Sequence, residues 1–117
     1  MAKISFKDFE KIMLYDISKI PGSCIEIDFD VQGSLKYQGS WLGKMINNDT
    51  NKEDYWFGLV PDGSEAYEFT NFGDFTNAKI FDGKSLKEIW SVISIVTIDG
   101  VDAHEMLPYR IPSWKPF

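Results

Sequence analysis

The chain has 117 residues, a length that suits one domain around one hydrophobic core. Hydrophobic residues make up 44% of it and aromatic residues 15%, a composition that argues against an intrinsically disordered chain. The 12 Lys and Arg residues against 18 Asp and Glu give a formal charge of -6, which argues against sequence-independent nucleic-acid binding and suits either a basic partner or plain solubility.

The first predicted element is an amphipathic helix that begins after Ser5. The Ser5 hydroxyl can accept a hydrogen bond from a first-turn amide, and the helix dipole favours the carboxylate of Asp8 in that turn. One apolar face continues at helical spacing through Phe6, Phe9, Met13 and Ile17. Pro21-Gly22 is expected to end the segment. We expect this helix to cover a sheet.

A strand with one acidic face is predicted over Cys24–Val31, where apolar and polar residues alternate strictly. The side chains predicted to point to solvent are Glu26, Asp28 and Asp30. Gln32-Gly33-Ser34 is a plausible hairpin turn, and it predicts a second strand over residues 35–41.

The run over residues 47–54 is polar and charged, and it predicts a long exposed loop of the kind that often carries function. A strand is predicted over residues 55–60. Pro61-Asp62-Gly63 then predicts a turn, because proline suits its second position and glycine tolerates a positive φ. The return strand is predicted over residues 65–69. Residues 72–80 fit a short helix or a loop equally well.

The rest of the chain is organised around residues 82–100. Ser85 and Glu88 form a capping-box pattern, which predicts a helix near residues 85–92. The next six residues are almost all β-branched and predict a strand buried on both faces, ended by Asp99-Gly100. The side chains predicted to be buried here are Trp90, Ile93, Ile95 and Ile98.

After Gly100, residues 101–107 suit one or two helical turns that end before Pro108, and residues 109–117 are expected to be extended. The elements together predict one α+β domain over residues 1–117. It has a mainly antiparallel sheet, an N-terminal helix and a helix near residues 85–92. Two alternatives for the shape of this sheet are strong curvature and closure into a barrel.

No motif predicts a catalytic, cofactor or metal site. Gly83-Lys84-Ser85 resembles the end of a phosphate-binding loop, but Ala78 occupies the position of the first required glycine. His104-Glu105 resembles half of a zinc-protease motif, but Pro108 stands where the second histidine is needed. We therefore expect no enzyme activity and no cofactor.

The expected compartment is the cytoplasm. The single cysteine, Cys24, excludes an intramolecular disulfide and fits an inert buried thiol. Residues 1–8 lack the apolar core of a signal peptide, and no apolar run approaches the length of a membrane span.

Carboxylates recur on the predicted loops and strands, although adjacent like charges destabilise a sheet. Two interpretations stay open: protection of the sheet edges against aggregation, and an acidic surface that docks on a basic partner. Under the second interpretation, the candidate partner-binding residues are Asp49, Glu53, Asp54, Tyr55, Trp56, Asp62, Glu65 and Glu68.

The small acidic α+β design, together with residues 55–59 and 81–90, resembles the bacterial immunity proteins of polymorphic toxin systems. Those of contact-dependent growth inhibition are the nearest group. The resemblance implies a cytoplasmic, non-enzymatic protein that binds one cognate toxin domain, typically a basic nuclease, and occludes its active site. Neither nucleic acid nor a membrane is an expected partner. The alternative is a small-molecule-binding domain with an aromatic-lined cavity.

Overall fold

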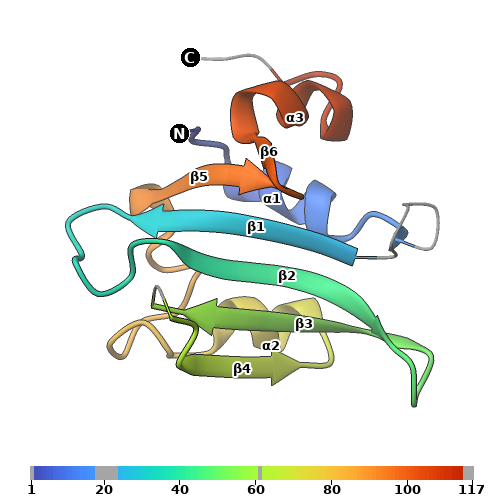
Figure 1. Cartoon of the computed structure of the whole chain (residues 1–117), viewed down its shortest axis with the longest axis horizontal. Helices are drawn as coiled ribbons and strands as arrows, with labels where there is room; N and C mark the ends of the chain where they lie inside the picture. Colours follow the sequence, from blue (N-terminus) through green and yellow to red (C-terminus); the bar gives the residue numbers. More distant parts are fainter. Residues whose placement is uncertain (1, 18–23, 61, 115–117) are drawn as a thin grey trace.

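A computed structural model describes residues 2–17, 24–60 and 62–114 of the chain (Figure 1). They form a six-stranded sheet in the order β4-β3-β2-β1-β5-β6, in which every neighbouring pair is antiparallel. β4 and β6 are separate edges, so the sheet is open and the barrel alternative is not realised. The predicted α+β class is confirmed.

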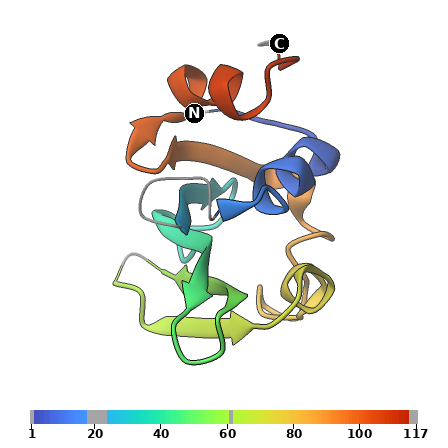
Figure 2. The same ribbon diagram turned by 90° about the vertical axis from the view of Figure 1, so that its right-hand side faces the viewer.

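The strands are β1 (Cys24–Val31), β2 (Ser40–Asn47), β3 (Lys52–Leu59), β4 (Glu65–Phe69), β5 (Ile93–Ile98) and β6 (Val101–Asp102). The helices are α1 (Phe6–Met13), α2 (Phe72–Asn77), the 3₁₀ helix η2 (Trp90–Val92) and α3 (Ala103–Arg110). Figure 2 shows α1 and α2 on the same side of the sheet, while α3 lies beyond β5 and β6. The core therefore fills one face of the sheet.

The structure confirms the predicted alternation of β1. Ile25, Ile27 and Phe29 are fully buried beneath the helices, whereas Glu26, Asp28 and Asp30 belong to the opposite face. The predicted cap of α1 is also confirmed, because the Asp8 N–H donates to Ser5 Oγ at 3.0 Å.

Helix α1 is shorter than predicted, since it ends at Met13. Ile17 is still buried, so the apolar face continues beyond the break in the helix at residues 14–16. The carbonyl of Tyr15 accepts a hydrogen bond from Lys44 Nζ at 2.9 Å, which ties this turn to β2. The predicted stop at Pro21-Gly22 lies outside the described residues.

The predicted turn at residues 32–34 is present, since the Ser34 N–H donates to the Val31 carbonyl at 3.1 Å, but the strand predicted from Leu35 is wrong. Residues 32–39 form a longer connection, and β2 begins only at Ser40. Tyr37 is buried with its ring 5.3 Å from that of Phe81, and the Gly39 N–H donates to Asp30 Oδ1 at 2.7 Å. The chain leaves the sheet here because Tyr37 gains a buried contact with a distant segment.

The long loop predicted over residues 47–54 is also wrong. Asn47 pairs with Lys52, so β2 and β3 extend into the polar run and only residues 48–51 connect them. The Asn47 Oδ1 accepts from the N–H groups of Asp49 and Thr50, at 2.9 and 3.3 Å. A side-chain amide thus closes a tight hairpin that polar composition alone does not reveal.

The predicted hairpin of β3 and β4 is confirmed, with Gly63 at φ +67° donating its N–H to the Val60 carbonyl at 2.9 Å. Residues 72–80, for which helix and loop stayed open, begin with α2. Asn71 caps this helix by accepting the Asp74 N–H at 2.7 Å.

The capping box is confirmed in both directions. The Ser85 N–H donates to Glu88 Oε1 at 3.0 Å, and the Glu88 N–H donates to Ser85 Oγ at 3.2 Å. The following segment is nevertheless not a regular α-helix, because it consists of turns and the 3₁₀ helix η2. The Lys87 N–H donates to the carbonyl of Thr76, so a hydrogen bond to a residue distant in sequence takes the place of a hydrogen bond within a helix.

Strand β5 is confirmed, and Ile93, Ile95 and Ile98 are buried as predicted, but Val96 and Thr97 are only half-buried, so burial on both faces does not extend along the whole strand. Trp90 is only half-buried: its ring lies 4.4 Å from that of Phe9, while its Nε1–H donates to the Ile4 carbonyl at 2.8 Å.

The predicted helix end before Pro108 is wrong, because α3 continues to Arg110. Pro108 lies inside this helix and cannot donate a backbone hydrogen bond. The helix is nevertheless held in place by the buried side chains of Ala103, Leu107 and Ile111. The guanidinium of Arg110 also pairs with the carboxylate of Asp99, on the turn before β6. The extended tail expected over residues 109–117 is wrong for its described part: the helix includes Tyr109 and Arg110, and a turn follows in which the Trp114 N–H donates to the Ile111 carbonyl at 2.9 Å. Residues 115–117 lie outside the described part.

Candidate protein-binding surface

The face of the sheet opposite α1 and α2 is left open by these helices (Figure 2). Residues directly opposite each other in paired strands point to the same face. The register therefore gathers a set of outward-facing residues on four neighbouring strands: Glu26, Asp28, Trp41, Gly43, Met45, Asp54, Trp56, Gly58, Ala66 and Glu68. Carboxylates and two tryptophans share this open face.

Trp56 lies across the sheet because its neighbour on β2 is a glycine. Gly43 pairs with Trp56, and Glu68 pairs with Trp56 from the other side. A Cβ atom at Gly43 would lie 2.6 Å from Cζ2 of Trp56 and 2.2 Å from the carbonyl oxygen of Ile25. Only glycine leaves room for this close approach, so β2 supports the indole and holds it half-buried.

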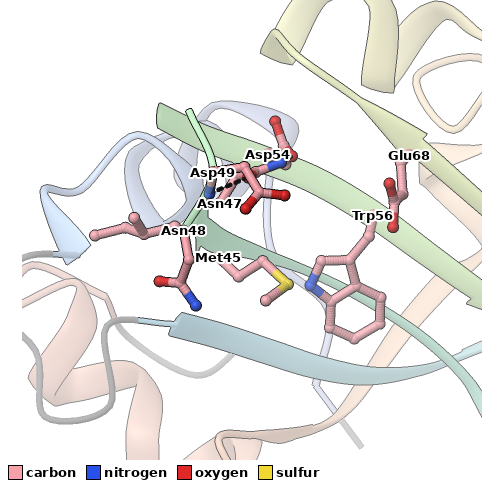
Figure 3. A pocket seen from close by; sticks show the side chains of 8 residues that line it. Met45, Asn47, Asn48, Asp49, Asp54, Trp56 and Glu68 are labelled. Atoms are coloured by element: carbon pink, nitrogen blue, oxygen red, sulfur yellow. Dashed lines mark hydrogen bonds between the residues drawn. The ribbon is translucent and has the colours of Figure 1, made fainter. Parts of the chain in front are cut away.

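Trp56 also forms a wall of a groove with a volume of about 330 Å³ (Figure 3). The other lining residues are Met45, Ile46, Asn47, Asn48, Asp49, Asp54 and Glu68. Figure 3 shows the Met45 sulfur pointing towards the indole and the Glu68 carboxylate beside it. The Asn47 amide donates to Asp54 Oδ2 at 2.8 Å, which orients that carboxylate.

A second groove of about 350 Å³ adjoins the first, because Asp54 and Glu68 line both of them. It adds Asp74 from α2, together with Phe69 and Thr70. Carboxylates beside a half-buried aromatic ring and an exposed thioether make a site for a cation that carries an apolar stem.

The structure therefore brings four of the eight candidate residues together: Asp49, Asp54, Trp56 and Glu68. Tyr55 and Glu53 belong to the other face of β3. Tyr55 is 6% exposed, with its ring 5.3 Å from that of Phe75, and Glu53 pairs with the buried ammonium of Lys44.

Asp62 and Glu65 lie at the far end of β3 from Asp49. The strand has eight residues, so at about 3.3 Å per residue its two ends are roughly 23 Å apart. Glu65 pairs with Lys36 at 3.0 Å. The Ser64 side chain, and then the Ser64 backbone N–H, donate hydrogen bonds to the carboxylate of Asp62 and lower its pKa.

The candidate residues predicted from the sequence did not include Met45, Asn47 and Asn48, because the second strand was predicted to end at residue 41, whereas β2 continues to Asn47. The available signal was the alternation Trp41, Gly43, Met45, which places Met45 on the tryptophan face once β2 is recognised as a strand.

Asp28 lies on the same open face, opposite Thr97 of β5. Its Oδ1 atom and the Thr97 Oγ1 atom are buried and have no hydrogen-bond partner within the described residues. Burial, and secondarily the charge of Asp30, raise the pKa of Asp28 above its usual value. The charged form of Asp28 is therefore unfavourable in this partly buried position.

Within residues 2–17, 24–60 and 62–114, no group of three or more His, Cys, Asp and Glu side chains is placed to hold a metal ion. None of the helices in this described part is long and apolar enough to cross a membrane.

No protein-family model matches the chain, and neither a curated protein nor a solved structure matches it significantly.

Proposed function

We propose that the protein is a non-enzymatic, cytoplasmic inhibitor of the immunity-protein type, which binds a cognate toxin domain and covers its basic active site. The observation that supports this proposal is the open sheet face, on which carboxylates surround the half-buried indole of Trp56. A toxin that cleaves nucleic acid must present cationic side chains to the phosphates. The carboxylates of the open sheet face would attract these cations.

The open face is large enough for a protein partner. A stable interface covers about 800 Å² on each side, and the two longer dimensions of this molecule are 36 and 33 Å. The sheet lies across this broad side of the molecule (Figure 1). Carboxylates at its rim would speed association, and Trp56 would serve as the buried anchor.

The alternative, a small-molecule-binding domain, has less support. It requires an aromatic-lined cavity, but the aromatic rings between the sheet and α2 pack on one another. Phe57 stacks on Phe75 at 4.4 Å, and Phe81 meets Phe57 edge-on at 5.6 Å.

The test is co-expression with basic toxin domains encoded beside the gene for this chain, followed by binding measurements on the purified pair. We expect restored growth, an equimolar complex and an affinity that falls as salt rises. A protein that binds none of these domains, but gains thermal stability with a metabolite, would support the alternative instead.

A further inference from the structure

We infer that the groove beside Trp56 receives the side chain of one arginine of the partner, with its guanidinium stacked on the indole and paired with Glu68 and Asp54. This inference rests on the proposed function, because it takes the partner to be a basic protein. It goes further by naming the group that is recognised and the residues that recognise it.

The first argument is that the indole is held in place before any partner binds. Gly43 lies directly against it, and the cross-strand neighbour Glu68 stands on its other side. Figure 3 shows the ring spread across the sheet next to the Met45 side chain. A ring that is already fixed loses little conformational freedom when a ligand stacks on it, so stacking contributes more to affinity.

The second argument comes from the ion pairs that the protein makes internally. Several carboxylates have a cationic partner within the chain, as Glu53 has Lys44 and Glu65 has Lys36. In the described part of the chain, no salt bridge involves the groove residues Asp49, Asp54 and Glu68. Their charges converge on one groove and remain available to an external cation.

The third argument distinguishes arginine from lysine. A guanidinium is planar and weakly hydrated, so it can stack on an indole and direct its N–H groups to a carboxylate at its edge. An ammonium is a compact, strongly hydrated charge that gains less from a flat aromatic wall. The thioether of Met45, which is 48% exposed, offers an apolar contact for the methylene stem.

The probe for this site is N-acetyl-arginine amide, titrated into the full chain while two kinds of resonance are followed by NMR: the indole N–H of Trp56, and the backbone N–H groups of its cross-strand neighbours Gly43 and Glu68, which also report on variants that lack the indole. N-acetyl-citrulline amide is the matched neutral control, because it keeps the planar end group without the charge. We expect a saturable shift with the arginine probe, weaker binding of the lysine analogue and no saturation with citrulline.

Two variants locate the site. Glu68→Gln removes a charge, and Trp56→Leu removes the ring while it keeps an apolar side chain; each should weaken binding of the probe at least about tenfold. Asp62→Asn, at the other end of β3, is the matched charge control and should bind normally. Thermal melts of all variants establish that they are folded.

Equal shifts with arginine and citrulline, or unchanged affinity in folded Glu68→Gln, would overturn the inference. The outcomes also separate it from the proposed function. A toxin bound with unchanged affinity by Trp56→Leu would leave the inhibitor role intact and refute the arginine site. A probe that binds as expected, with no toxin bound, would refute the inhibitor role alone.

Discussion

At the scale of single residues, the least expected side chain is that of Lys44. It is 1% exposed, donates to the Tyr15 carbonyl at 2.9 Å and pairs with Glu53. Its ammonium also lies 5.7 Å from the centre of the Tyr55 ring. A buried lysine is stable only when its charge and its donors are satisfied. Glu53 therefore serves the core and is not available to a partner.

Asp28 provides a prediction at this scale. Its folded-state pKa is raised above 3.8, first by burial and then by Asp30. Below pH 3.8 the neutral carboxyl carries no penalty, whereas stability is lost as the pH rises through the raised folded pKa. We expect Asp28→Asn to increase the melting temperature at pH 7 and to have little effect at pH 3.

Glu26→Gln is the control for this measurement, because Glu26 is an exposed carboxylate on the same strand and face. If Asp28→Asn lowered the melting temperature at pH 7, the carboxylate would have a stabilising partner and the argument from burial would fail.

At the scale of elements, the capping box that precedes η2 has a titratable member. Hydrogen bonding to Lys79, and then to the Ser85 backbone, lowers the pKa of Glu88 from 4.5 to about 2. A lowered folded-state pKa means that the stabilisation is fully present above pH 4.5 and is lost as the pH falls towards 2. Glu88→Gln should remove this pH dependence.

The measurement is urea denaturation of the wild type and the variant at several pH values between 2 and 6. We expect their difference in unfolding free energy to shrink as the pH falls. A difference that stays constant over this range would show that the charge of Glu88 contributes nothing and that only its cap geometry matters.

Strand β5 allows a test of the core. Ile95 is 1% exposed and exchanges two backbone hydrogen bonds of 2.7 Å with Ala2, so it joins the N-terminus to the sheet. Ile95→Ala should lower the unfolding free energy by about 2 to 5 kcal/mol, because the smaller side chain leaves a cavity. Leu35→Ala is the control at an apolar residue that is 95% exposed, and it should change stability by less than about 0.5 kcal/mol. An unchanged denaturation midpoint for Ile95→Ala would contradict the assigned packing of β5.

At the scale of the whole molecule, the acidic face should act mainly on the rate of association. The formal charge of -6 and the groove carboxylates attract a basic partner before contact is made. Asp54→Asn with Glu68→Gln should slow association with the toxin by about tenfold at low salt. The difference should shrink as the Debye length falls from about 10 Å at 0.1 M to about 3 Å at 1 M ionic strength.

Asp62→Asn with Glu105→Gln is the matched control, because it removes the same charge at exposed positions away from the groove. Association and dissociation rates are measured at several ionic strengths. If both double variants slowed association equally, the net charge and not the acidic face would steer the partner.

Several parts of the fold were determined by the sequence alone. The alternation in β1, the capping box at Ser85 and Glu88, and the turns at Gly63 and Gly100 all match the predictions. Each of them depends on residues a few positions apart, so local spacing and backbone freedom carry the information.

Tertiary structure decided the features that depend on distant partners. Tyr37 leaves the sheet to meet Phe81, and Lys44 is buried because Tyr15 and Glu53 satisfy it. The candidate site was predictable in part, since acidic and aromatic residues near position 55 were identified from the sequence. Their division between two faces of β3, and the support of Trp56 by Gly43, follow from strand register. Register is fixed by pairing between strands and by burial of one face, which no single stretch of the chain specifies.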